Sequence, residues 1–147
     1  MRGPEFPEPM PFAELLTAFP KAEVRQPSLN LVKSVEFDSR RVTPGACFVC
    51  RQGLREDGHA YVREAVDAGA VAVVAERSVI VPAGVGLALV LDARQALAAL
   101  ARHIWAEPDL ELGTIGVTGT DGKTTTSHLI DAMLQACLLY TSPSPRD

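Results

Sequence analysis

Apolar and polar residues follow two different periods along the chain, and these periods predict a succession of helices and strands. Residues 11–19 (PFAELLTAF) carry apolar residues at helical spacing, which predicts a short helix. Residues 31–37 (LVKSVEF) alternate between apolar and polar, and residues 46–50 (ACFVC) form a compact apolar run, so we expect a strand in each. Between them, residues 43–46 (TPGA) predict a turn, because proline presets φ and glycine permits a tight reversal.

The middle of the chain repeats this order of helix and strand. Residues 58–69 (GHAYVREAVDAG) predict a helix that ends at Gly69. The runs 70–75 (AVAVVA) and 86–91 (GLALVL) are continuously apolar, which is typical of parallel strands that helices cover on both faces. One face of the predicted helix is expected to carry Tyr61, Ala65 and Ala68.

Residues 92–107 (DARQALAALARHIWAE) predict another helix, with Asp92 as its N-cap. After it, a strand is expected over Ile115–Val117, followed by a glycine turn and a final helix from about Lys123. Strand and helix therefore alternate throughout, and the predicted fold class is α/β. The buried stripe of the helix over 92–107 is expected to contain Leu97, Leu100, Ala101, Ile104 and Trp105.

Composition and charge restrict the class of partner. The chain has 147 residues and a formal net charge of −4, and no basic block stands out. Basic clusters are what bind nucleic acid and anionic membranes, so we expect neither partner and favour a small molecule. The sequence has no apolar run long enough for a membrane span, and its proline-broken start lacks the apolar core of a signal peptide, so a cytoplasmic location is expected.

The three cysteines do not predict a disulfide framework, since their number is odd. Cys47 and Cys50 have the C-x-x-C spacing of many redox and metal sites. Within a strand, however, a spacing of three places the two side chains on opposite faces. We therefore expect two small buried residues there and no metal or redox site.

The stretch TGTDGKTTTSHL, residues 118–129, carries the most explicit chemistry. A glycine turn that leads into a helix through Lys-Thr can hold nucleotide phosphates with backbone N–H groups and the positive helix end. Lys123 is expected to neutralise the β- and γ-phosphates as the catalytic residue, and the Thr124 hydroxyl to ligate Mg²⁺. A turn that only joins a strand to a helix is the alternative. The expected ATP-binding residues are Gly119, Thr120, Asp121, Gly122, Lys123, Thr124 and Thr125.

The segment GVTGTDGKTTT resembles the ATP loop of the Mur ligase family, whose pattern is close to G-T-N-G-K-T-T and accepts Val or Ile at the position of Val117. Asp121 stands where Asn is usual, which places a negative charge beside the phosphates. Upstream, residues 37–76 resemble the family's N-terminal pattern D-S-R-x-V-x-P-G-D-x-F-V-A, then D-G-H-x-F and G-A-x-A-V-V. The loop ending K-T-T-T favours the MurE type over the MurF type. The departures from the N-terminal pattern are Ala46, Cys50 and Tyr61.

The resemblance covers about residues 30–136 and implies an ATP- and Mg²⁺-dependent ligase of peptidoglycan precursor synthesis. Such an enzyme phosphorylates the D-glutamate γ-carboxylate of UDP-N-acetylmuramoyl-L-alanyl-D-glutamate, and a diamino acid (diaminopimelate, lysine or ornithine) then displaces the phosphate. Arg40 is a candidate anion ligand, with a structural ion pair as the open alternative, whereas Asp57 and His59 are expected to fix the loop and cap the following helix. The residues expected at the UDP end of the substrate are Phe37, Ser39, Leu54, Arg55 and Glu56.

The resemblance also predicts a domain order. Residues 1–24 would form an N-terminal extension with a short helix, 25–107 the UDP-substrate-binding domain, and 108–136 the first strand, phosphate loop and helix of a truncated P-loop ATPase-like central domain. Residues 137–147 (CLLYTSPSPRD) contain two helix-breaking prolines and back-translate into a sequencing-library adaptor, so we expect them to be non-native.

The chain would then be an inactive fragment of a ligase that is monomeric at full length. The alternatives are a MurF-type fragment, a UDP-sugar-binding module without activity, and a phosphate-loop kinase or ATPase. The last of these gives no reason for the D-S-R, P-G and D-G-H block upstream.

Overall fold

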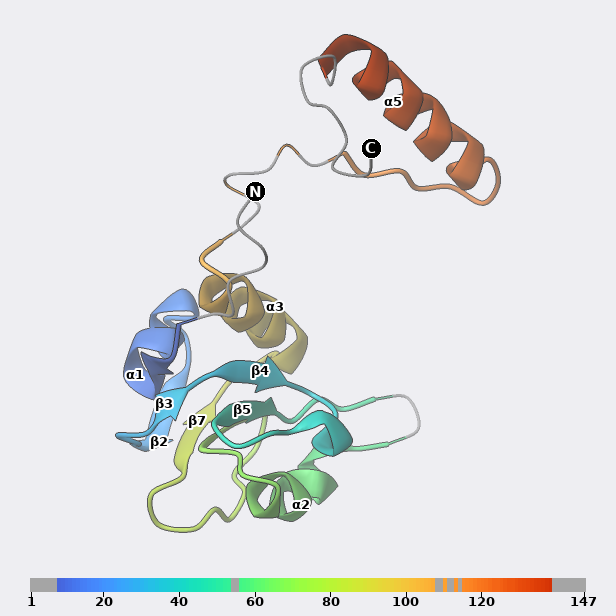
Figure 1. Cartoon of the computed structure of the whole chain (residues 1–147). Coiled ribbons are helices and arrows are strands. Elements are labelled where there is room, and N and C mark those ends of the chain that lie inside the picture. Colours follow the sequence, from blue (N-terminus) through green and yellow to red (C-terminus); the bar gives the residue numbers. More distant parts are fainter. Residues whose placement is uncertain (1–7, 54–55, 108–109, 111–112, 114, 139–147) are drawn as a thin grey trace. The chain divides into compact units, whose positions relative to one another are not determined.

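The computed structural model describes residues 8–53, 56–107, 110, 113 and 115–138 (Figure 1). The chain divides into two compact units, Met1–Glu111 and Leu112–Asp147. Among the described residues, no helix is both long and apolar enough to cross a membrane.

A five-stranded sheet forms the centre of the first unit, with the strand order β2-β7-β6-β5-β4. The four strands from β4 to β7 are parallel, and β2 pairs antiparallel with β7 at one edge. Every residue of β5 and β6 is buried, as expected for central strands with helices on both faces. The strands are β2 (Glu23–Gln26), β4 (Ser34–Glu36), β5 (Ala46–Val49), β6 (Ala72–Ala75) and β7 (Gly86–Leu89).

Helices cover both faces of this sheet, which confirms the predicted α/β class. On one face lie α1 (Phe12–Leu15), the 3₁₀ turn η1 (Leu16–Ala18) and α3 (Ala93–Ile104). On the other lie the 3₁₀ turn η3 (Gly58–Tyr61) and α2 (Val62–Asp67). Figure 1 shows α1 and α3 on one side of β5 and α2 on the other.

Alternate residues of β5 enter two separate hydrophobic cores. Cys47 and Val49 pack in the core beneath α1 and α3, whereas Phe48 and the residue after the strand, Cys50, pack in the core beneath α2. Both cysteines are free and fully buried, and burial raises the pKa of each thiol to about 12. The prediction of two buried cysteines on opposite faces is therefore confirmed.

The segment predicted as one strand over 31–37 divides into two. β3 (Leu31–Val32) pairs antiparallel with β1 (Met10–Pro11), and β4 joins the main sheet. The described residues of α1 pack into the core of the first unit, where Phe12 is 1% and Leu15 0% exposed. The segment expected to be an extension thus contributes large side chains to the core.

The helix α3 begins as predicted, since Oδ1 of its N-cap Asp92 accepts hydrogen bonds from the backbone N–H groups of Arg94 (2.9 Å) and Gln95 (3.0 Å). Leu100 and Ile104 are buried, whereas Leu97 and Ala101 are only partly buried. The prediction that Trp105 is buried is wrong, because its side chain is 50% exposed. Trp105 is the C-cap, with φ −91° and ψ 18°, so it no longer follows the helical stripe.

The helix predicted over 58–69 begins with the 3₁₀ turn η3, and this changes which side chains it buries. Val62 and Ala65 are the buried residues of α2, whereas Ala68 is exposed. Tyr61 is partly buried and contacts the core from outside the α-helix. Gly69 follows the helix with φ +106°, the left-handed conformation expected of a glycine stop.

The second unit contains the helix α5 (Lys123–Leu138), which begins at the predicted residue. The strand predicted over Ile115–Val117 is not formed, and Ile115 is 59% exposed. A strand is stabilised by pairing with a neighbour, and the described residues of this unit offer no strand with which it could pair. Most of the predicted adaptor segment, residues 139–147, lies outside the described residues.

Candidate functional site

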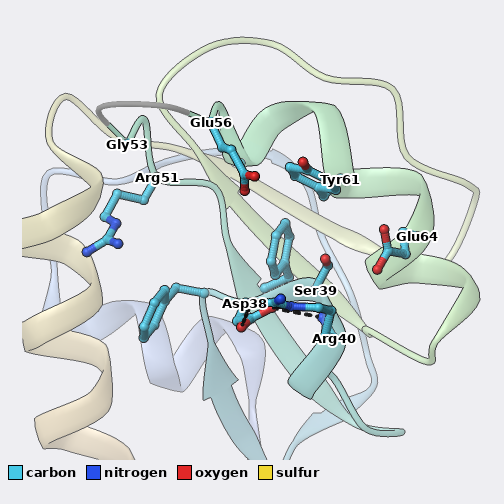
Figure 2. A pocket seen from close by; sticks show the side chains of 11 residues that line it. Asp38, Ser39, Arg40, Arg51, Gly53, Glu56, Tyr61 and Glu64 are labelled. Atoms are coloured by element: carbon cyan, nitrogen blue, oxygen red, sulfur yellow. Dashed lines mark hydrogen bonds and ion pairs between the residues drawn. The ribbon is translucent and has the colours of Figure 1, made fainter.

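A pocket of about 470 Å³ lies at the carboxyl ends of β4 and β5 in the first unit (Figure 2). Residues 37–40, which follow β4, form one side of its lining. The loop after β5 contributes Arg51, Gly53 and Glu56, and further residues come from the start of the α2 region. Open α/β sheets bind ligands outside the carboxyl ends of their strands, and ligand pockets commonly have this volume. The pocket is therefore the best candidate for a small-molecule site in this unit.

Asp38 and Arg40 form an ion pair at the pocket. Asp38 caps the short 3₁₀ turn η2 (Ser39–Arg41) by accepting a hydrogen bond from the Arg40 backbone N–H at 3.1 Å. Its two carboxylate oxygens also accept hydrogen bonds from Arg40 Nε at 2.9 Å and from a terminal guanidinium nitrogen at 2.7 Å. These side-chain hydrogen bonds lower the pKa of Asp38 to about 2 and raise that of Arg40. Of the two alternatives left open for Arg40, the structure shows the ion pair.

Ser39 presents a hydroxyl group to the pocket from an almost buried position. The residue is 9% exposed, yet it belongs to the pocket lining. Its hydroxyl forms no hydrogen bond with any of the residues that the structure describes. A hydroxyl can both donate and accept, so Ser39 can hydrogen-bond a ligand without first breaking an internal contact.

Arg51 lies over the ring of Phe37, with its guanidinium carbon 4.8 Å from the ring centroid. This distance is within the range of cation–π contacts. Arg51 makes no ion pair with a carboxylate in the part of the chain that the structure describes. Arg51 was not predicted as a site residue, although its place two residues after the end of a buried strand was a usable signal for a site at the carboxyl edge of the sheet.

Asp57 and His59 anchor the described end of the loop that borders the pocket, and Asp57 caps the 3₁₀ turn η3, as predicted. Asp57 Oδ1 accepts hydrogen bonds from the backbone N–H of His59 at 3.0 Å and from His59 Nδ1 at 2.6 Å. His59 Nε2 accepts the backbone N–H of Glu76 at 3.1 Å, so the pattern assigns the ring proton to Nδ1. Arg77 pairs with the second Asp57 oxygen. The pKa of Asp57 is lowered, first by the His59 backbone N–H and then by the His59 ring.

The structure brings together those predicted substrate residues that it describes. Phe37, Ser39 and Glu56 all line the pocket. Leu54 and Arg55 lie outside the described residues. Besides Arg51, sequence reasoning missed the lining residues Phe48, Gly53, Gly58, Tyr61 and Glu64. Tyr61 and Glu64 were read only as parts of a helix, and their position next to the loop was not visible from helical periodicity.

The predicted ATP-binding residues lie in the second unit, in the glycine turn before α5 and in the first helical turn of α5. Gly119 has φ +152° and Gly122 φ +75°, so both use backbone conformations that favour glycine. Lys123 Nζ donates hydrogen bonds to the backbone oxygens of Gly119 (2.6 Å) and Thr120 (3.2 Å). The ammonium group is thereby held at the turn, next to the positive end of the helix.

The chemistry of this turn fits a phosphate ligand. The first backbone N–H groups of a helix have no partner within it, and here they accompany a lysine. The exposed Thr124 hydroxyl lies in the first turn of α5 and would suit a Mg²⁺ ion that also binds phosphate oxygens. Among the described residues, no cluster of His, Cys, Asp and Glu could hold a metal by itself.

The chain was compared with known proteins, and a family model matches it. Residues 31–105 match the family model described as "Mur ligase family, catalytic domain". Two similar curated proteins are both named UDP-N-acetylmuramoyl-L-alanyl-D-glutamate–2,6-diaminopimelate ligase. The one from Geobacillus thermodenitrificans is 43% identical over 122 residues, which are 83% of this chain and 24% of that protein. The one from Chlorobium phaeobacteroides is 43% identical over 136 residues, which are 90% of this chain and 27% of that protein.

Solved structures are similar as well. MurF from Acinetobacter baumannii has a TM-score of 0.70 at 28% sequence identity, covering 90% of this chain and 29% of that chain. MurF ligase from Thermotoga maritima, solved in complex with ADP, has a TM-score of 0.55 at 34% identity, covering 71% of this chain and 23% of that chain. The chain thus spans about a quarter of the length of the curated relatives that it matches.

Proposed function

Because the chain belongs to the Mur ligase family, we propose that it supplies two ligand sites of an ATP-dependent ligase of peptidoglycan precursor synthesis. The proposed reaction joins 2,6-diaminopimelate to UDP-N-acetylmuramoyl-L-alanyl-D-glutamate, as the names of the curated relatives state for those proteins. The curated relatives of this type are 43% identical, whereas the MurF structure from Acinetobacter baumannii is 28% identical. This difference favours the MurE type over the MurF alternative.

The first proposed site is the pocket at the carboxyl ends of β4 and β5, which would hold the UDP end of the substrate. The observation that carries this proposal is the Ser39 hydroxyl, which faces the pocket and has no hydrogen-bond partner among the described residues. Phe37 and Glu56 line the same pocket. Ser39 would hydrogen-bond the uridine diphosphate, and the residues around it would exclude water from one side of the ligand.

The second proposed site is the turn over Gly119–Thr125, which would bind the phosphates of ATP. ATP supplies the phosphoryl group that activates a substrate carboxylate. The chain's own contribution is to position and to neutralise charge: backbone N–H groups bind the phosphates and Lys123 offsets their negative charge. The Thr124 hydroxyl would be one ligand of the accompanying Mg²⁺.

We propose that the first compact unit acts as the substrate-binding domain and that the second belongs to the ATP-binding domain. Both proposed ligands are soluble nucleotides, which supports a cytoplasmic location. We also expect the full-length ligase to act as a monomer.

Calorimetric titration of the 147-residue chain tests the two sites separately. Wild-type protein should bind UDP-N-acetylmuramoyl-L-alanyl-D-glutamate and, independently, ATP with Mg²⁺. Ser39→Ala should weaken binding of the UDP ligand by roughly fivefold or more and leave ATP binding unchanged, because one hydrogen bond to a charged group is lost. Lys123→Ala should have the reverse effect. Binding of ATP without any binding of the UDP ligand would contradict the proposal.

A further inference from the structure

We propose that Arg51, rather than Arg40, is the cation that pairs with the diphosphate of the UDP group, and that the ring of Phe37 holds Arg51 in position. This inference rests on the proposed function of the pocket. It assigns a role to Arg51, which the family pattern does not mark, and a positioning role to the Phe37 side chain.

The two arginines of the pocket differ in what they already bind. Arg40 gives both Nε and a terminal nitrogen to the carboxylate of Asp38, at 2.9 and 2.7 Å. Its charge is therefore offset by an adjacent anion, and two of its in-plane donors are occupied. To bind a phosphate with full strength, Arg40 would first have to leave Asp38 unpaired.

Arg51 has no such carboxylate partner among the described residues. Its contact is with the face of the Phe37 ring, at 4.8 Å from guanidinium carbon to centroid. A cation–π contact is an attraction between the charge and the ring, and among the described residues no carboxylate occupies the N–H donors of Arg51. The in-plane donors of Arg51 can therefore form the paired hydrogen bonds that a phosphate group accepts.

The backbone of Arg51 is also fixed. Arg51 lies two residues after the end of β5, and its backbone oxygen accepts a hydrogen bond from the Gly58 N–H at 3.0 Å. With the backbone held by Gly58 and the side chain held by Phe37, little conformational freedom remains to be lost when a ligand binds.

The charges of the pocket favour the Arg51 side for an anion. Figure 2 shows Arg51 on the side of the pocket opposite Glu64 and Arg40. The Arg40 side is close to electrically balanced by Asp38 and also carries the Glu64 carboxylate, which would repel a phosphate. Glu56 is a further carboxylate in the pocket lining and would also repel the diphosphate. An arginine without a carboxylate partner is therefore required to offset the charge of the ligand.

NMR titrations of the 147-residue chain with uridine and with UDP test the inference, because the two ligands differ only in the diphosphate. Arg51→Ala should weaken UDP binding by about tenfold to a hundredfold, as expected for lost charge-assisted hydrogen bonds, and should leave uridine binding unchanged. Arg51→Lys should recover part of the loss, since it keeps the charge but not the planar fork. Arg63→Ala removes an equal charge from an exposed position outside the pocket and should have no effect on either ligand.

Two further variants test the choice of arginine and the role of Phe37. The double variant Asp38→Asn, Arg40→Gln removes the ion pair without changing net charge, and it should weaken UDP binding less than Arg51→Ala does. Phe37→Leu should weaken UDP binding in the wild type but add little to Arg51→Ala, as expected when one residue acts through the other. A loss of uridine affinity in Phe37→Leu would instead show that the ring stacks on the base, and would overturn its positioning role.

The outcomes separate this inference from the proposed function. If the wild type binds UDP and Arg51→Ala binds it equally well, Arg51 is not the diphosphate ligand and the pocket proposal stands. If Arg51→Ala weakens binding of the full UDP-N-acetylmuramoyl-dipeptide but not of UDP, Arg51 contacts a carboxylate and the inference is wrong. If the wild type binds neither UDP nor the full substrate, the proposed function itself fails.

Discussion

Asp38 and Arg40, two residues apart in the sequence, close a ring of hydrogen bonds in which one carboxylate receives the backbone N–H and two guanidinium nitrogens of the same arginine. The pair shapes the turn that carries Ser39 into the pocket. It also offsets the charge of Arg40. The D-S-R motif therefore positions a serine, and its arginine has a structural partner.

The low pKa of Asp38 leads to a pH-dependent stability. Its pKa is about 2 in the folded chain, against 3.8 for an ordinary aspartate side chain. A carboxylate with a depressed folded pKa stabilises the fold fully above its unfolded pKa, and this contribution is lost as the pH falls from about 4 towards 2. Asp38→Asn keeps a capping oxygen but cannot ionise. Its melting temperature, followed by circular dichroism, should fall less over this pH range than that of the wild type; parallel curves would contradict the assignment.

Gly69 and Gly84 form a matched pair for measuring the cost of a side chain. Both have positive φ, +106° and +90°. A Cβ at Gly69 would lie 2.8 Å from the backbone Cα of Pro44, whereas a Cβ at Gly84 would meet nothing within 4 Å. Gly84→Ala should therefore cost only the backbone term, about 1–2 kcal/mol. Gly69→Ala should cost about 1–3 kcal/mol more in urea unfolding, because backbone must move. Equal losses would show that the contact with Pro44 relaxes freely.

The buried thiols of Cys47 and Cys50 should be unreactive. Both are fully buried, and desolvation raises their pKa to about 12, so neither reactive thiolate nor access is available near neutral pH. In a Cys137→Ser background, the folded chain should not react with Ellman's reagent. After unfolding in guanidinium chloride both thiols should react. Fast reaction of the native protein would argue against the burial of this strand.

Asp121 should weaken ATP binding at the phosphate turn. Asp121 is exposed and stands where the Mur ligase pattern has Asn. Its negative charge would repel the phosphates of the ligand, and the solvent would screen this repulsion. Asp121→Asn should strengthen ATP binding by about two- to fivefold at low salt, the size expected of an exposed charge pair. The gain should shrink as salt screens the charges. A gain that is independent of salt would indicate a change in the shape of the turn instead.

Sequence periodicity predicted the elements whose side chains pack against the core. The apolar runs of β5, β6 and β7 and the capped helix α3 were found because burial requires a continuous pattern. β2 was missed, since Glu23–Gln26 has no buried side chain and joins the sheet through backbone pairing with β7, which an apolar pattern does not reveal. The strand predicted over Ile115–Val117 shows the opposite error, because an apolar pattern without a pairing partner is not sufficient for a strand.

The candidate site could be predicted only where a motif carried it. Ser39 and the turn over Gly119–Thr125 have short, specific patterns. The pairing of Asp38 with Arg40, and the contact of Arg51 with Phe37, depend on side-chain directions that a sequence pattern does not contain. Tyr61 reaches the pocket because a 3₁₀ turn precedes α2, and this shift was not visible from helical spacing.

The most direct test of the account is to map both ligands on the chain by backbone amide NMR. If the first unit binds the substrate and the second binds ATP, UDP-N-acetylmuramoyl-L-alanyl-D-glutamate should shift the amide signals of pocket residues such as Ser39, Arg51 and Tyr61 and leave Gly119–Thr125 unchanged. ATP with Mg²⁺ should do the reverse. Shifts from the UDP ligand that are confined to the phosphate turn, or that are absent from the pocket, would contradict the assignment of the first unit as the substrate-binding domain.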